Sequence, residues 1–116
     1  MPTLNMQGPY EFTRDEVDNQ IRRHQIGNYA LGKLNQYGDF VVHYVGRSDT
    51  DVNGRIKDHL QEWYTHFMFS YASSPKAAFE KECQNYHDFG ESRLLDNDVH
   101  PDIPSNSKNW KCPVCG

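Results

Sequence analysis

The chain has 116 residues with a net charge of −4, and aromatic residues make up 13 % of it. This length fits one small domain, and the aromatic content argues against global disorder. No apolar stretch approaches the ~20 residues of a membrane span, and the start of the chain, MPTLNMQGPYEF, lacks the pattern of a signal peptide. We therefore expect no membrane association. The acidic charge disfavours nucleic-acid binding in general but leaves room for a local basic groove.

The cysteine content indicates the compartment. Three Cys residues are an odd number and too few for a disulfide scaffold. A reducing, intracellular compartment is therefore expected. We predict a cytoplasmic protein and leave the nucleus open.

The first predicted elements are a helix and a β-hairpin. Thr13 and Glu16 stand at capping-box spacing before a helical pattern, which predicts a helix over about 14–24. Two runs rich in aromatic and branched residues, 28–34 and 39–46, flank a turn that contains glycine. This pattern is typical of a hairpin.

The second half of the chain predicts two more helices and one more strand. The polar stretch 47–54 has the residue types of a loop, and apolar positions at helical spacing predict a helix over 55–64. A short aromatic run, 66–72, predicts a third strand. Ser74 is a suitable N-cap for a helix over 75–89 that ends at a glycine.

The order of these elements predicts the fold class. Helix, hairpin, helix, strand and helix indicate an α+β domain in which helices cover one small three-stranded sheet. We place this domain in residues 1–97, with its core at about 26–97. Residues 98–116 form a tail rich in Pro, Asp and Asn that ends in a CxxC motif.

Five side chains could carry chemistry, although each also has an ordinary structural interpretation. Tyr29 and Tyr44 fall in the two hairpin strands, where tyrosine is usually packing. Arg55 and His59 are four residues apart, a spacing that is usually a solvated helix face. Glu82 falls on the apolar side of the last helix, and a buried carboxylate needs a partner such as a divalent metal.

Taken together, these residues resemble a known family. Gly27–Tyr29, then Tyr44–Gly46, then Arg55, His59 and a helical Glu82 resemble the motifs of the GIY-YIG nucleases. The resemblance covers about residues 26 to 97 and implies a three-stranded antiparallel sheet flanked by helices.

Two positions depart from the family pattern or leave a choice. Asn28 stands in the middle of the first triplet, at a position that varies in the family. Glu80 is the alternative to Glu82 as the metal-binding glutamate. The resemblance also assigns substrate binding to Gly46, Arg47 and Asn97.

The resemblance implies an endonuclease that hydrolyses phosphodiester bonds in DNA with one divalent metal. Glu82 would hold Mg²⁺ or Mn²⁺, and Arg55 would neutralise charge on the phosphoryl oxygens. One of Tyr29 and Tyr44 would act as general base, with His59 assisting proton transfer or holding a tyrosine in place. DNA is the expected partner. A targeting protein could direct the enzyme, and a homodimer could cut both strands.

The CxxC motif of the tail suggests a structural zinc site. Cys112 and Cys115 have the spacing of one zinc knuckle. Cys83 and His87 are four residues apart on the last predicted helix, so both could face the same metal. His100 is the alternative to this histidine. Without zinc, these residues would be ordinary packing residues and free thiols.

Two other functions compete with the nuclease. A non-catalytic module with the same fold could bind nucleic acid or protein and use the zinc site only for structure. A thiol redox protein would use Cys112 and Cys115, but a redox CxxC normally begins a helix that follows a strand.

Overall fold

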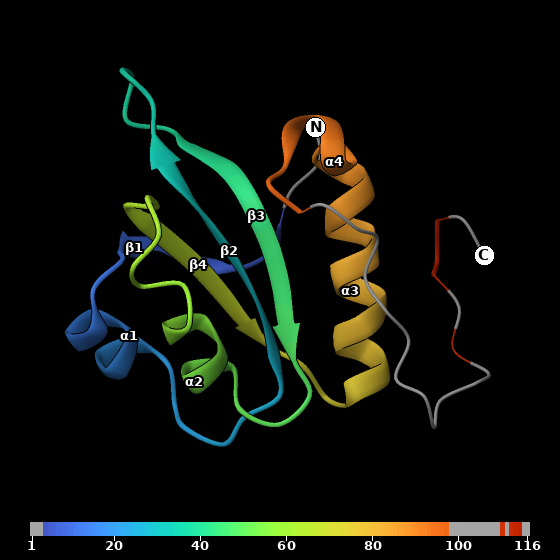
Figure 1. Cartoon of the computed structure of the whole chain (residues 1–116). Helices are drawn as coiled ribbons and strands as arrows, with labels where there is room; N and C mark the ends of the chain where they lie inside the picture. The colour runs from blue at the N-terminus through green and yellow to red at the C-terminus, as the bar shows by residue number, and fades with distance from the viewer. Residues whose placement is uncertain (1–3, 98–109, 111, 115–116) are drawn as a thin grey trace.

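The computed structural model describes residues 4–97, 110 and 112–114. One antiparallel sheet has the strand order β1-β4-β2-β3. Figure 1 shows α3 along one face of this sheet and α1 and α2 on the other. The predicted α+β class is confirmed. The elements are β1 (Gln7–Glu11), α1 (Arg14–Gln20), β2 (Gly27–Leu34), β3 (Phe40–Ser48), α2 (Val52–Lys57), β4 (His66–Tyr71), α3 (Pro75–Asp88) and α4 (Glu91–Leu94).

The predicted number of strands was wrong, because the sheet has four strands rather than three. The missed strand is β1, which pairs with β4 alone at one edge of the sheet. Gly8 and Pro9 lie within it and weaken the sequence signal for a strand. Proline has no N–H group to donate, but an edge strand tolerates it because one side needs no partner.

The predicted hairpin is confirmed as β2 and β3. The Asn35 side-chain oxygen accepts hydrogen bonds from the backbone N–H groups of Tyr37 and Asp39 and closes the turn. Gly38 takes a φ of 83°, which is accessible to glycine at little cost. Strand β3 continues to Ser48, two residues beyond its predicted end.

The first helix is capped as predicted but is shorter. The Thr13 hydroxyl accepts the backbone N–H of Glu16 at 3.1 Å. Helix α1 ends at Gln20, because Ile21 turns to an extended conformation and buries its side chain. The Asn53 side chain, from α2, donates to the Ile21 carbonyl oxygen and so takes the place of a further helical bond.

Helix α2 is displaced from its predicted range, 55–64. It begins at Val52 and ends at Lys57. Tighter turns follow, in which the N–H of His59 bonds the carbonyl of Ile56 three residues back. Arg55 and His59 are therefore not on one continuous α-helical face, contrary to the sequence-based expectation.

The last predicted strand and helix are confirmed as β4 and α3. The Ser74 hydroxyl caps α3 by accepting the N–H of Ala77 at 3.1 Å. Gly90 follows the helix with a φ of 102°. The short helix α4 was not predicted, and Leu95, just after it, is buried against the sheet.

Apolar side chains fill both sides of the sheet. Side chains from β2 and β4 join those of α1 and α2 on one face, while α3 and the segments around Leu4 and Leu95 cover the other. Among the described residues, no helix is long and apolar enough to cross a membrane. A smaller cluster joins the C-terminal segment to α3 and contains Phe79, Cys83, Trp110 and Cys112.

Candidate functional site

Two tyrosines from neighbouring strands form the centre of the candidate site. Tyr29 of β2 and Tyr44 of β3 stack with their ring centroids 6.3 Å apart. Tyr29 lies opposite Gly46 in the pairing of the two strands. A Cβ atom on this glycine would lie 2.4 Å from the Tyr29 hydroxyl oxygen, so a side chain here would collide with the ring. The two predicted triplets therefore fit together at this point.

A histidine and a glutamate extend the tyrosine pair. The Tyr29 hydroxyl lies 3.0 Å from Nε2 of His59, and the His59 and Tyr44 rings are 4.7 Å apart. Nδ1 of His59 lies 2.8 Å from a carboxylate oxygen of Glu62. An ionised carboxylate only accepts, so a neutral imidazole donates from Nδ1 and accepts at Nε2. The Tyr29 O–H then donates to His59.

Arg55 contributes positive charge beside the tyrosines. Its side chain is 53 % exposed and lies 3.4 Å from a carboxylate oxygen of Asp58. Burial and the neighbouring Tyr44 raise the pKa of the Tyr29 phenol, whereas the charge of Arg55 opposes this shift. The balance keeps Tyr29 protonated.

Glu82 is a buried carboxylate on α3. Its side chain is 11 % exposed and forms an ion pair with Arg47, whose Nε lies 3.1 Å from Oδ1 of Asp49. Burial raises the pKa of Glu82 despite the opposing charge of Arg47. The guanidinium therefore lies where a cation bound to Glu82 would have to come. Glu80, the alternative, is half-buried on the same helix.

Asn28 ties the helix that carries Glu82 to the sheet. Its side chain is fully buried and donates from Nδ2 to the carbonyl oxygen of Ala78 at 2.9 Å. Ala78 is one turn before Glu82 on α3. The residue that departs from the family triplet thus fixes the position of this helix.

The charge of Glu82 acts on the tyrosine pair. Burial raises the pKa of Tyr44, and the negative charge of Glu82 adds to that rise. Burial is also the main cause of the raised pKa of Glu82, and Arg55 works against it. The structure therefore places Tyr29, Tyr44 and His59 in direct contact, with Arg55 beside them. Glu82 lies on α3 and acts on the two tyrosines through its charge.

Asn97, a predicted substrate-binding residue, is buried beside the edge strand β3. Its Oδ1 accepts the N–H of Val45 at 3.0 Å, and its Nδ2 donates to the carbonyl of the same residue at 2.8 Å. The side chain is buried and pairs with the edge strand β3 as another strand would. These contacts give Asn97 a structural role in covering that edge.

The described zinc candidates meet at the C-terminal half of α3. Cys83 and Cys112 pack in one buried cluster. Although burial opposes the shift, hydrogen bonding to Glu91 and then to Cys112 raises the pKa of His87. Cys115 and the alternative ligand His100 lie outside the described residues. Within the part of the chain that the structure describes, no three His, Cys, Asp or Glu side chains are gathered closely enough to hold a metal by themselves.

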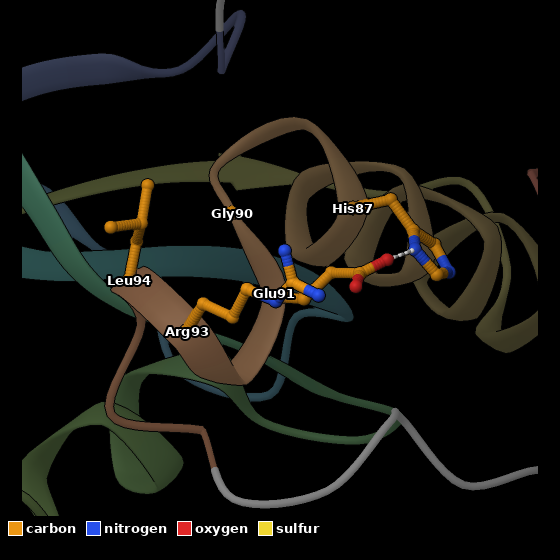
Figure 2. A pocket seen from close by; sticks show the side chains of 5 residues that line it. All are labelled: His87, Gly90, Glu91, Arg93 and Leu94. Atoms are coloured by element: carbon orange, nitrogen blue, oxygen red, sulfur yellow. Dashed lines mark hydrogen bonds and ion pairs between the residues drawn. The ribbon is translucent and has the colours of Figure 1, made fainter.

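An open hollow of about 420 Å³ lies near this cluster, between the end of α3 and α4 (Figure 2). It is separate from the tyrosine pair. His87 crosses one side of it and contacts Glu91 through Nδ1 at 2.5 Å. Its lining consists of His87, Gly90, Glu91, Arg93 and Leu94.

Two site residues were missed from the sequence. Glu62 lies three residues after His59 and contacts it, and this short spacing could have suggested the pair. Asp49 contacts Arg47 from the loop after β3, where an acidic residue is so common that it gives no signal.

Comparison of the chain with family models, curated proteins and solved structures finds no match.

Proposed function

We propose that this protein is a metal-dependent endonuclease that hydrolyses phosphodiester bonds in DNA at the site around Tyr29 and Glu82. The observation that carries the proposal is the contact of Tyr29, Tyr44 and His59, with Arg55 beside them and the charge of Glu82 acting on the tyrosines. These side chains include an acid–base chain, an exposed guanidinium and a buried carboxylate. The resemblance of their motifs to the GIY-YIG nucleases supports the same function, and so does the antiparallel sheet between helices.

The hydrogen-bond chain Tyr29–His59–Glu62 provides a route for the proton of an attacking water. A tyrosine with a raised pKa is a poor base if it must ionise first. Tyr29 can instead accept a proton from water while its own proton passes to Nε2 of His59. The resulting imidazolium is stabilised by the carboxylate of Glu62.

Access to the Tyr29 hydroxyl sets a condition on this route. Tyr29 is only 1 % exposed, whereas Tyr44 is half-buried and Arg55 is more open. A water can therefore reach the hydroxyl only if substrate binding rearranges the side chains around it. Arg55 would meet the phosphate at the surface and neutralise its developing charge.

The residues around Glu82 fit a divalent metal. Glu82 and Asp49 offer two carboxylates on either side of Arg47. Mg²⁺ and Mn²⁺ prefer one or two such ligands together with waters. The ion would supply positive charge that stabilises the leaving oxygen. A cation held by Glu82 would compete with the guanidinium of Arg47 for that carboxylate.

The test is a cleavage assay on supercoiled, linear and branched DNA with Mg²⁺, Mn²⁺ or a chelator. Glu82→Ala is compared with the matched variant Glu80→Ala on the same helix. We expect metal-dependent cleavage by the native chain and by the Glu80 variant, and none by the Glu82 variant. Circular dichroism verifies that both variants are folded.

Two results would contradict the proposal. A folded native protein that cuts none of these substrates with either metal would favour a binding module. Cleavage lost in Glu80→Ala and kept in Glu82→Ala would mean that the metal is bound by a different face of α3.

A further inference from the structure

We propose that Cys83, His87, Cys112 and Cys115 bind one structural zinc ion that fastens the C-terminal segment to α3. The site is separate from the proposed nuclease centre, and its zinc would take no part in the reaction. Four ligands would close a tetrahedral shell and leave no position for substrate.

The first argument is the meeting of three ligand side chains from distant parts of the chain. Cys83 and His87 are one turn apart on α3, and Cys112 packs with Cys83 in one buried cluster. No disulfide joins Cys83 to Cys112. Because Cys112 comes more than twenty positions after α3 ends, its presence there needs an attraction that local sequence does not provide.

The second argument is the orientation of the histidine. Nδ1 of His87 lies 2.5 Å from a carboxylate oxygen of Glu91, as Figure 2 shows. A zinc-binding histidine usually donates its second ring N–H to a carboxylate in this way, which fixes the tautomer. Nε2 is then the nitrogen that would bind the metal.

The third argument is the surroundings of the thiols. Cys83 is fully buried, and Cys112 is 6 % exposed. The Phe79 and Trp110 rings lie 5.8 Å apart and cover them from one side. An apolar cover limits access of water and competing ligands to zinc–sulfur bonds.

The fourth ligand follows from the sequence. Cys112 and Cys115 have the CxxC spacing by which two thiolates bind one zinc ion. The described residues form no three-ligand group on their own. A ligand outside the described residues is therefore required, and the CxxC spacing predicts Cys115.

This site would also stiffen the support of the nuclease centre. Cys83 is adjacent to Glu82 on α3. Phe79, which packs on Trp110, lies under the guanidinium of Arg47 at 5.2 Å. A zinc-bound C-terminal segment would therefore hold Phe79 in place beneath the Arg47–Glu82 ion pair.

The first experiment measures zinc per chain by atomic emission, after purification and dialysis against a mild chelator. The native chain should retain one zinc ion, whereas Cys112→Ser and His87→Asn should lose most of it. His24→Asn is the matched control, because His24 is exposed and its φ of 62° suits asparagine. Absence of zinc in the native chain would overturn the proposal. Zinc kept by His87→Asn would overturn the assignment of His87.

The second experiment does not depend on how the variants fold. Cobalt replaces zinc in the native chain, and the intensity of the thiolate-to-cobalt absorption should indicate three thiolates in a tetrahedral site. Glu82→Gln should give the same spectrum, because Glu82 belongs to the other centre. A spectrum with no thiolate absorption would overturn the proposal. Neither experiment uses nuclease activity, so failure of the proposed function leaves them decisive.

Discussion

The ring of Tyr29 lies across the backbone of Gly46, the residue that faces it from β3. A Cβ atom at position 46 would lie 2.4 Å from Cζ and the hydroxyl oxygen of that ring. We expect Gly46→Ala to lower the free energy of unfolding by about 1–3 kcal/mol, the usual range for overpacking. Urea denaturation measures this change.

A double-mutant cycle identifies the cause. Tyr29→Ala removes the ring that the new methyl group would strike, so adding Gly46→Ala to it should cost much less than it costs alone. If the two losses simply add, the backbone of β3 rather than the ring requires glycine at this position. Gly38→Ala serves as a comparison, since nothing lies within 4 Å of a Cβ there and only its positive φ resists the change.

Local patterns were sufficient to predict much of the fold. The caps at Thr13 and Ser74 were predicted correctly because they depend on residues within one turn. Strand β1 was missed because Gly8 and Pro9 disfavour a strand locally, whereas pairing with β4 supplies the stabilisation. The end of α1 was misplaced for a similar reason, since a side chain from α2 takes the Ile21 carbonyl.

The candidate site was likewise predictable only where it depends on local sequence. The identity and order of Tyr29, Tyr44 and Glu82 could be read from the sequence, but their partners could not. The ion pair of Arg47 with Glu82 joins β3 to α3 across 35 positions of the chain. The contacts of Asn97 with Val45 span 52 positions. Such pairs depend on packing, which no local pattern encodes.

Tyr29→Phe tests the proton route. The variant keeps the packed ring but removes the hydroxyl that donates to His59. Cleavage should fall by about 10²–10⁴-fold, the usual contribution of general acid–base catalysis. Tyr37→Phe, in the exposed hairpin turn, should leave the rate unchanged. Equal rates for the native chain and Tyr29→Phe would remove this hydroxyl from the mechanism.

Asn97→Asp separates a structural role from substrate binding. The carboxylate cannot donate to the Val45 carbonyl and leaves it without its partner. The free energy of unfolding should fall by about 1–3 kcal/mol. DNA affinity, measured well below the unfolding transition, should match that of Gln36→Glu, an exposed change of the same kind in the hairpin turn. Weaker DNA binding with unchanged stability would instead give Asn97 the substrate role.

Arg47→Ala tests the competition between guanidinium and metal. Without Arg47, the buried Glu82 lacks its ion-pair partner, and a divalent metal can supply the missing charge without displacing a side chain. The rise in Tm on adding Mn²⁺ should therefore be larger in Arg47→Ala than in the native chain. Arg14→Ala, an exposed control on α1, should respond as the native chain does. A smaller rise in Arg47→Ala would mean that Arg47 helps to build the metal site.

The pH dependence of metal binding follows from the burial of Glu82. Burial raises its pKa above the ordinary value of 4.5, although Arg47 opposes the shift. The metal-free fold therefore favours protonated Glu82. The stability that this protonated side chain contributes is lost as pH rises through the raised pKa. Metal binds only the ionised form, so the Tm increase produced by Mn²⁺ should grow over the same pH range.

Glu82→Gln, which does not titrate, should show a small Tm increase that is independent of pH across this range. Thermal unfolding with and without Mn²⁺ at a series of pH values measures both proteins. A native increase that stays constant from acid to neutral pH would mean that the metal binds to groups other than Glu82. If the Tm increase instead develops around pH 4.5 or below, the Glu82 carboxylate is hydrated in solution, because burial is the largest cause that raises its pKa.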